Sequence, residues 1–140
     1  MKLTLKRKKG FTLLEIIIVV IIVGVLASLA LPRLFSTVEF SRSTEALAAI
    51  GSLRSAMERC LLKSGNTYLG CTKLTLDMSD PDGNPGTHFT YAVTNQSGTG
   101  YALTAVRNTL DGGVVTSNII ITQTATGVTR TGNTAFAGVK

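Results

Sequence analysis

The chain has 140 residues, of which 44% are hydrophobic, and its formal net charge is +6. This length suits one compact domain with one additional element. Five of the 14 Lys and Arg residues lie within residues 1–10, and the other nine are nearly balanced by eight Asp and Glu. The positive charge therefore belongs to the N-terminus, and it does not indicate a nucleic-acid-binding surface.

The N-terminus combines a basic segment, which ends at Gly10, with a long apolar run over residues 11–31. As a helix, this run would be about 31 Å long, close to the hydrocarbon thickness of a bilayer. Basic residues flank the cytoplasmic end of a membrane span. The chain is therefore predicted to insert into a membrane with its N-terminus in the cytoplasm and residues after 31 outside it. The basic residues are Lys2, Lys6, Arg7, Lys8 and Lys9.

A single charge, Glu15, interrupts the apolar run. A carboxylate in a membrane span costs about 3 kcal/mol near the middle of the helix and less near its end. One explanation is a capping box, because Thr12-x-x-Glu15 has the required spacing. The other is a partner charge from a second subunit. Cleavage after Gly10 would create an α-amino group on Phe11, and a neighbouring copy shifted along the helix axis could offer that amine to Glu15.

The run Lys-Gly-Phe-Thr-Leu-Leu-Glu, which ends at Glu15, and the closing Ala-Leu-Pro, which ends at Pro32, resemble a known signal. They are similar to the class III signal segment of type IV pilins and of the pseudopilins of type II secretion. This resemblance implies cleavage between Gly10 and Phe11 by a prepilin peptidase, N-methylation of Phe11, and assembly into a helical filament. It also implies that Pro32 stands where the family helix is commonly bent or locally melted. Beyond Arg33 only the layout is shared.

The resemblance also implies partners and a location. The partners are copies of the chain itself, other pilins or minor pilins, the prepilin peptidase and an inner-membrane assembly platform. The predicted organisation is a removed leader (1–10), a transmembrane or filament-core helix (11–33) and an exported globular domain (34–140). The chain would cross the bacterial inner membrane once before assembly and then stand in a pilus on the cell surface.

Two other interpretations of the N-terminus remain open. An ordinary secretory signal could be cleaved after Ala30, since small residues precede that bond, although the apolar run exceeds the usual length of about 7–15 residues. The run could also be a permanent single-span anchor. Either would make the exported part a binding module, a different class of protein from a filament subunit.

The helical period continues beyond the apolar run and predicts an amphipathic helix from about Ser36 to Lys63. Ser36-x-x-Glu39 has the spacing of a helix start, and Gly65 provides a stop. Pro32 lacks an N–H donor, which predicts a kink or a few unwound residues around 27–33. The apolar stripe of this helix comprises Val38, Leu47, Ile50, Leu53, Met57 and Leu61.

A segment rich in Gly, Asn, Ser, Asp and Pro, residues 64–86, is predicted to be a loop. Cys60 and Cys71 bracket its start, and two cysteines on the exported side favour a disulfide over a metal site. The bridge would close a 12-residue ring and contribute about 3 kcal/mol. Two buried free thiols are the alternative.

Three carboxylates in the same loop, Asp77, Asp80 and Asp82, make a calcium site conceivable. The spacing lacks the later Glu of an EF-hand loop, and an Asp-Pro-Asp-Gly turn needs no metal. No cofactor is therefore predicted.

From Thr87 onward the pattern alternates with a period of two. Strands are predicted over 87–94, 101–106, 114–122 and 127–130, and Gly-containing turns separate the first three. The predicted fold class is therefore α+β, with a long N-terminal helix packed on a three- to four-stranded antiparallel sheet that has a Thr-rich outer face. Residues 119–121, all Ile, do not alternate, so this strand is either covered on both faces or part of an interface.

Few residues are suited to catalysis. His88 is the only histidine, and its position among threonines on a strand predicts a surface residue. The sequence contains no HExxH, CxxC or phosphate-loop motif, so the chain is not predicted to be an enzyme. A pilin is favoured over a pseudopilin because no Asp or Glu follows Asp111, whereas the resemblance to major pseudopilins implies a calcium site in that region. Adhesion, motility, DNA uptake and conduction are equally compatible with these residues.

Overall fold

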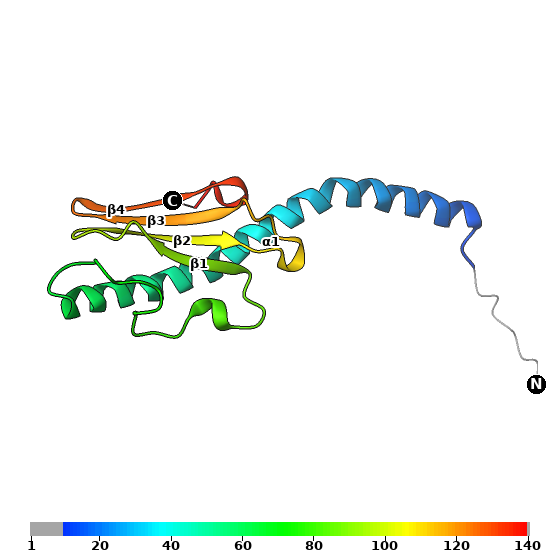
Figure 1. The fold of residues 1–140 in the computed structure, drawn as a ribbon. Helices are drawn as coiled ribbons and strands as arrows, with labels where there is room; N and C mark the ends of the chain where they lie inside the picture. The colour runs from blue at the N-terminus through cyan, green and yellow to red at the C-terminus, as the bar shows by residue number, and fades with distance from the viewer. Residues whose placement is uncertain (1–9, 140) are drawn as a thin grey trace, which may run out of the picture. The chain divides into compact units, whose positions relative to one another are not determined.

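The computed structural model describes residues 10–139, so the basic residues of the predicted leader lie outside the described residues. The chain divides into two compact units after Phe35, and the long helix α1 (Leu13–Lys63) contributes its first part to one unit and its second part to the other. The remaining elements, which follow α1 along the chain, all belong to the second unit (Figure 1).

The first unit is the apolar part of α1. By length and composition, α1 is the one helix among the described residues that could cross a membrane, and none of its most apolar window is buried. The helix continues through Pro32. The predicted alternative of a few unwound residues around 27–33 is therefore wrong. Proline fits into the helix here because its fixed φ, about −65°, is itself a helical value.

The second part of α1 packs against the sheet through a narrow stripe. Ser43, Ala46, Ile50, Leu53 and Met57 are buried and recur every three or four residues. Ile50, Leu53 and Met57 were predicted to face the core, and they do.

Two details of the helix prediction are wrong. Val38, placed in the apolar stripe, is 40% exposed. Ser36-x-x-Glu39 does not start a helix, because α1 is already continuous there and Glu39 binds an arginine of the sheet instead. The stop at the other end is confirmed, since α1 ends at Lys63 and Gly65 has a left-handed φ of 75°.

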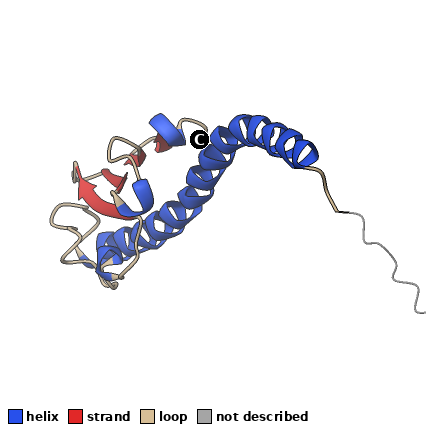
Figure 2. Cartoon of the chain, turned by 90° about the vertical axis from the view of Figure 1, so that its right-hand side faces the viewer, coloured by secondary structure: helices blue, strands red, loops and turns tan. Residues whose placement is uncertain are grey.

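The sheet is a four-stranded antiparallel meander of β1 (Phe89–Thr94), β2 (Tyr101–Arg107), β3 (Asn118–Thr124) and β4 (Gly127–Gly132). It lies along the second part of α1 (Figure 2). The predicted fold class is confirmed.

Inward and outward residues alternate along β1 and along the first part of β3, whereas β4 is exposed over most of its length. Ile119 and Ile121 are buried, whereas Ile120 is partly exposed on the opposite face between Thr104 and Thr131. The predicted third strand starts too early: Val114 lies in a turn whose carbonyl accepts a hydrogen bond from the Ser117 N–H (2.9 Å). Below the sheet, a core forms from strand aromatics and aliphatics, from α1 and from Phe136 of the 3₁₀ turn η3 (Thr134–Phe136).

Candidate functional site

The N-terminal candidate site comprises Gly10, Phe11 and Glu15. Gly10 is exposed and the Phe11 side chain is 76% exposed. Thr12 starts the helix: its hydroxyl oxygen accepts a hydrogen bond from the Glu15 N–H (3.2 Å), and its carbonyl accepts one from the Ile16 N–H (3.3 Å). Only half of the predicted capping box is therefore present. Within residues 10–139, the Glu15 carboxylate makes no hydrogen bond or ion pair.

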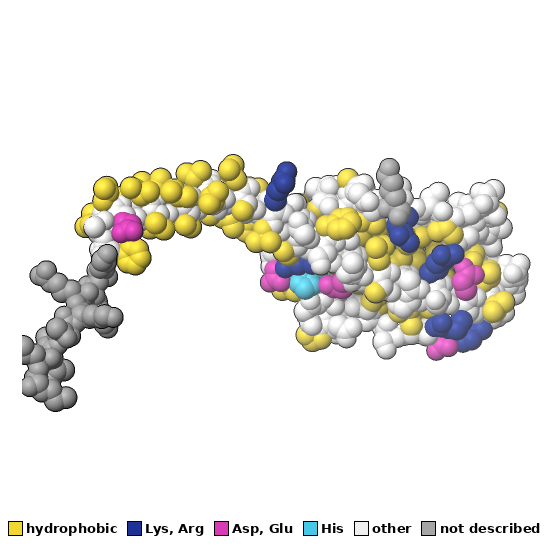
Figure 3. All heavy atoms as spheres, turned by 180° about the vertical axis from the view of Figure 1, so that it is seen from behind, with side chains coloured by type: hydrophobic (Ala, Val, Ile, Leu, Met, Phe, Trp, Pro, Cys, Tyr) yellow, Lys and Arg dark blue, Asp and Glu magenta, His cyan; other side chains and the backbone are white. Residues whose placement is uncertain are grey.

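Glu15 is surrounded by apolar surface rather than by other charges. The first part of α1 exposes large hydrophobic side chains along its length (Figure 3). A single carboxylate near the N-terminal end of such a helix lies where the partial positive charge of the helix dipole favours it. The arrangement leaves the carboxylate available to a cation from another molecule.

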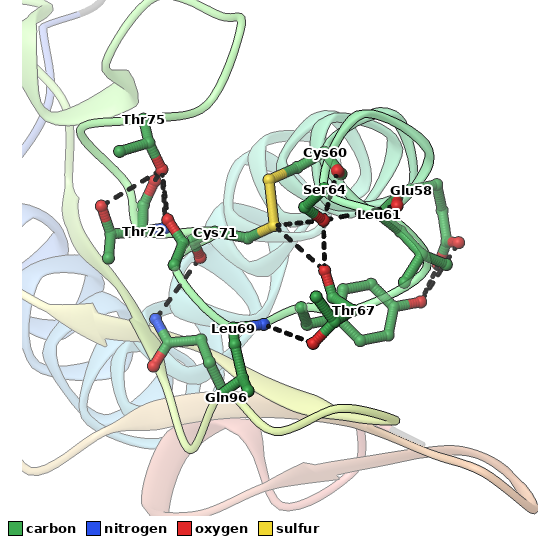
Figure 4. Close-up of a disulfide and its surroundings, with 12 residues drawn as sticks. Glu58, Cys60, Leu61, Ser64, Thr67, Leu69, Cys71, Thr72, Thr75 and Gln96 are labelled. Atoms are coloured by element: carbon green, nitrogen blue, oxygen red, sulfur yellow. Dashed lines mark hydrogen bonds between the residues drawn. A yellow bond between two sulfur atoms is a disulfide. The ribbon is translucent and has the colours of Figure 1, made fainter.

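The disulfide site lies at the opposite end of α1 (Figure 4). Cys60 and Cys71 form a disulfide with an S–S distance of 2.03 Å, which confirms the predicted bridge. The Ser64 hydroxyl donates to the Cys60 carbonyl (2.8 Å) at the end of the helix. Gln96, which follows β1, donates its side-chain N–H to the Cys71 carbonyl (3.4 Å). The loop is thus attached to both the helix and the sheet.

Tyr68 anchors the middle of the disulfide loop. Its ring is buried and packs edge-on against Tyr101 of β2, with ring centroids 4.7 Å apart. Its hydroxyl donates to a carboxylate oxygen of Glu58 (3.1 Å) on α1. Burial, reinforced by this hydrogen bond to an anion, raises the pKa of Tyr68 above its usual value.

The three aspartates of the predicted loop do not come together. Lys73 Nζ lies 3.0 Å from Asp80 Oδ1 and also binds Asp82, whereas Asp77 pairs with Lys63 (3.2 Å). Partial burial disfavours the charged form of the amine, but the hydrogen bonds that Lys73 donates to Asp82 and Asp80 outweigh this effect and raise the pKa of Lys73. In the described part of the chain no three His, Cys, Asp or Glu residues form a metal-binding group. Lys73 neutralises Asp80 and Asp82 of this acidic turn.

A buried arginine, Arg107 at the end of β2, was not anticipated from the sequence. Its side chain is fully buried and binds Glu39 of α1 with two nitrogens, Nε to Oε2 (3.1 Å) and Nη2 to Oε1 (3.3 Å). It also donates to the carbonyls of His88 (3.0 Å) and Leu110 (2.8 Å). The hydrogen bonds from Arg107, together with charge attraction, lower the pKa of Glu39. A buried charge with a bidentate partner and additional acceptors is compensated for its lost hydration.

His88 belongs to the same region and is not the surface residue that was predicted. Its side chain is 23% exposed, and both ring nitrogens contact carboxylates: Nδ1 lies 2.8 Å from Glu45 Oε2, and Nε2 lies 3.0 Å from Asp111 Oδ2. Arg42 also contacts Asp111 (3.3 Å). Neither ring nitrogen therefore contacts a hydroxyl or thiol that it could activate. We call these residues the polar cluster; its members are Glu39, Arg42, Glu45, His88, Arg107 and Asp111.

Comparison with known proteins identifies the N-terminal segment. Residues 5–31 match the prokaryotic N-terminal methylation motif. The match covers Gly10, Phe11 and Glu15 and most of the apolar part of α1. The matched motif spans only this N-terminal segment of the chain.

Several pilin-family proteins are similar over a longer stretch. A type IV major fimbrial protein FimA from Dichelobacter nodosus is 37% identical over 94 residues, which cover 65% of this chain and 59% of that protein. A probable minor fimbrial protein from the same organism is 47% identical over 66 residues, 47% of this chain and 41% of its own length. The type II secretion system core protein G of Pectobacterium carotovorum subsp. carotovorum is 48% identical over 52 residues, 37% of this chain and 33% of that protein.

Each of these similarities covers only part of the two chains that it compares. The chain spans 59% of the length of the FimA protein and less than half of the length of each of the other two proteins. The long helix followed by an antiparallel sheet is consistent with a pilin fold over the rest of the chain.

Proposed function

We propose that the chain is a structural subunit of a type IV pilus filament. The observation that carries this proposal is the methylation motif of residues 5–31, most of which lies in an apolar helix with no buried residues in its most apolar window. Such a helix needs either lipid or other copies of itself around it. The proposed role is non-enzymatic and needs no cofactor.

The proposed maturation follows from the motif. A prepilin peptidase removes residues 1–10 by cutting between Gly10 and Phe11, and the new amino group of Phe11 is methylated. Before assembly, residues 11–33 span the inner membrane once with their N-terminus in the cytoplasm, and residues 34–140 form the exported domain. The assembly platform then transfers the subunit into a filament of identical subunits and other pilins.

Glu15 is proposed to set the axial register of that filament by binding the Phe11 amine of a neighbour. Thr12 supports this role, because its own hydroxyl already caps the helix N-terminus (3.2 Å to the Glu15 N–H). Moving apolar helices from lipid into an apolar filament core changes little apolar burial, so a charge pair can decide the register. In that core the charge attraction is stronger than in water. Pro32 is proposed to ease adjustment of the helix during assembly, because it removes one backbone N–H.

The intact mass of the exported protein tests this proposal. Loss of residues 1–10 together with the mass of one methyl group on the N-terminal peptide is the expected result. The same mass should be found in filaments sheared from the cell surface. Cleavage after Ala30, or no cleavage, would instead support a secreted or single-span binding module.

A pseudopilin of a type II secretion system is the second candidate, and the similarity to core protein G favours it. Deletion of the chain separates the two. A pilin deletion should remove surface filaments and leave secretion of folded exoproteins intact, whereas a pseudopilin deletion should stop that secretion and leave surface filaments in place.

A further inference from the structure

His88 of the polar cluster lies between two carboxylates on two different elements. Glu45 belongs to α1, and Asp111 belongs to the 3₁₀ turn η2 (Leu110–Gly112). The Nδ1 contact to Glu45 (2.8 Å) and the Nε2 contact to Asp111 (3.0 Å) both have hydrogen-bond length. The imidazole ring is therefore the direct link between Glu45 and the η2 turn.

Both contacts are favourable only when the ring carries two protons. A neutral imidazole has one N–H donor and one acceptor nitrogen, and an ionised carboxylate is an acceptor only. Without its second proton, His88 would thus direct a lone pair at one of the two carboxylates. Histidine is the side chain that changes charge between about pH 5 and 8.

The contact to Asp111 is the one expected to fail when the proton is lost. Glu45 also accepts a hydrogen bond from the His88 backbone N–H (2.9 Å), which holds it in place. The Glu45 side chain is 36% exposed, whereas that of Asp111 is 57% exposed and more readily hydrated. The neutral ring would therefore keep its proton on Nδ1.

The other charged groups around His88 do not change charge near neutral pH. Arg42 contacts Asp111 (3.3 Å), and Arg107 donates to the His88 carbonyl (3.0 Å). Glu39 binds both arginines and has a lowered pKa. The hydrogen bond with His88 lowers the pKa of Asp111 as well, so it is ionised throughout this range.

The segment that Asp111 belongs to is tightly folded around Arg107. Asp111 has a left-handed φ of 51°, and a Cβ on Gly113 would lie 2.1 Å from the Asn108 carbonyl oxygen and 2.4 Å from Arg107 Cζ. Arg107 holds the Leu110 carbonyl (2.8 Å) at any pH between 5 and 9. Loss of the His88 contact to Asp111 would therefore loosen residues 108–117 without unfolding the sheet, because Arg42 and Arg107 still hold Asp111 and Leu110.

We propose that His88 is a proton-dependent clamp: its doubly protonated ring ties the η2 turn to α1 through Asp111 and Glu45. Loss of one proton breaks this tie, and Asp111 then contacts α1 through Arg42 alone. The clamp lies entirely within residues 36–139 and operates in the same way in a pilin or in a pseudopilin. A subunit with this clamp would present residues 108–117 in a more ordered form in acidic surroundings than in alkaline ones.

Hydrogen–deuterium exchange of the full processed chain in detergent micelles tests the clamp. Peptides covering residues 108–117 are compared at pH 5.5 and 8.5 after correction for the intrinsic exchange rate. Protection of this segment should fall about three- to tenfold at the higher pH, as expected for the loss of one partly exposed charge-assisted hydrogen bond. Peptides covering 73–82 serve as an internal control, because the pKa of Lys73 is raised and that of Asp80 is lowered, away from this pH range.

Asp111→Asn is the decisive variant, since Asn tolerates the left-handed backbone and lacks the charge. It should abolish the pH dependence, as should His88→Gln. Asp77→Asn removes one exposed carboxylate outside the cluster, and this variant should keep the pH dependence of the wild-type chain. An equal fall in protection in Asp111→Asn, or no fall in the wild-type chain, would overturn the clamp. A fall that EDTA abolishes would also overturn it, since the cluster would then hold a metal ion.

Discussion

Replacement of Arg107 by Met should destabilise the globular part of the chain more than any other single Arg substitution in it. The guanidinium is fully buried and donates to Glu39 and to three carbonyls, those of His88, Asn108 and Leu110. Met fills much of the volume but donates nothing. The variant therefore leaves Glu39 without its bidentate partner and removes the side-chain donor of three carbonyls. The carbonyls of His88 and Leu110 still accept backbone N–H groups from Asn108 (3.0 Å) and Gly113 (3.2 Å).

The expected loss is about 3 kcal/mol in the free energy of unfolding. Breaking a buried ion pair by removing one partner costs about 3–5 kcal/mol. The lower end applies here because Glu39 is 24% exposed and keeps its contact with Arg42 (2.7 Å). The lowered pKa of Glu39 adds a pH dependence: its contribution is present above the pKa of the unfolded chain and is lost as the pH falls through the lower, folded value. Arg107→Met should reduce that loss of stability in acid.

Tyrosine near-ultraviolet circular dichroism during urea unfolding is a suitable measurement. The three tyrosines, Tyr68, Tyr91 and Tyr101, all lie in the second unit and are buried, and the chain contains no Trp. The signal therefore reports on the globular part even when the full chain is held in detergent.

Arg59→Met is the matched control for this measurement. Arg59 lies on the exposed surface of the same helix and donates to the Asp77 carbonyl (2.9 Å). Its replacement should change stability by less than about 0.5 kcal/mol. If Arg107→Met were no more destabilising than Arg59→Met, the structural role assigned to the buried guanidinium would be incorrect.

Three further predictions concern processing, the disulfide and assembly. Gly10→Val should leave the leader attached, because the peptidase would meet a branched side chain. A Cβ at Gly10 meets no atom of the described residues within 4 Å, so the folded part of the chain should be unaffected, and processed subunits in this variant would contradict the proposal. Cys71→Ala should lower the unfolding free energy by about 3 kcal/mol through loss of the closed ring; two thiols that can be alkylated in the non-reduced wild type would refute this. Glu15→Gln subunits should insert and be cleaved normally. The ratio of sheared filament to membrane-bound subunit should nevertheless fall, because the amide lacks the charge that the register requires. An unchanged ratio would leave Glu15 as an ordinary helix-end residue.

Much of the architecture was accessible from local patterns in the sequence. Three features of the N-terminus lie next to one another in the sequence: the Gly10–Phe11 junction, Glu15 and the apolar run. The helical pattern of apolar residues repeats over several turns, and the alternating pattern of each strand repeats over several residues. The disulfide followed from there being only two cysteines on the exported side. Such features depend on neighbours along the chain, so no tertiary information was needed to predict them.

The polar cluster could be recognised only in the tertiary structure. Glu39 and Arg107 lie 68 positions apart, and Glu45 and His88 lie 43 apart. Many carboxylates could have paired with Arg107, and the choice depends on the register at which the sheet lies along α1. The spacing of Ser36 and Glu39 suggested a helix start, but a buried guanidinium attracts the carboxylate more strongly than a local backbone N–H does. The same reason explains why Lys73 lies between Asp80 and Asp82: a charge is satisfied by whichever opposite charge the fold brings within reach.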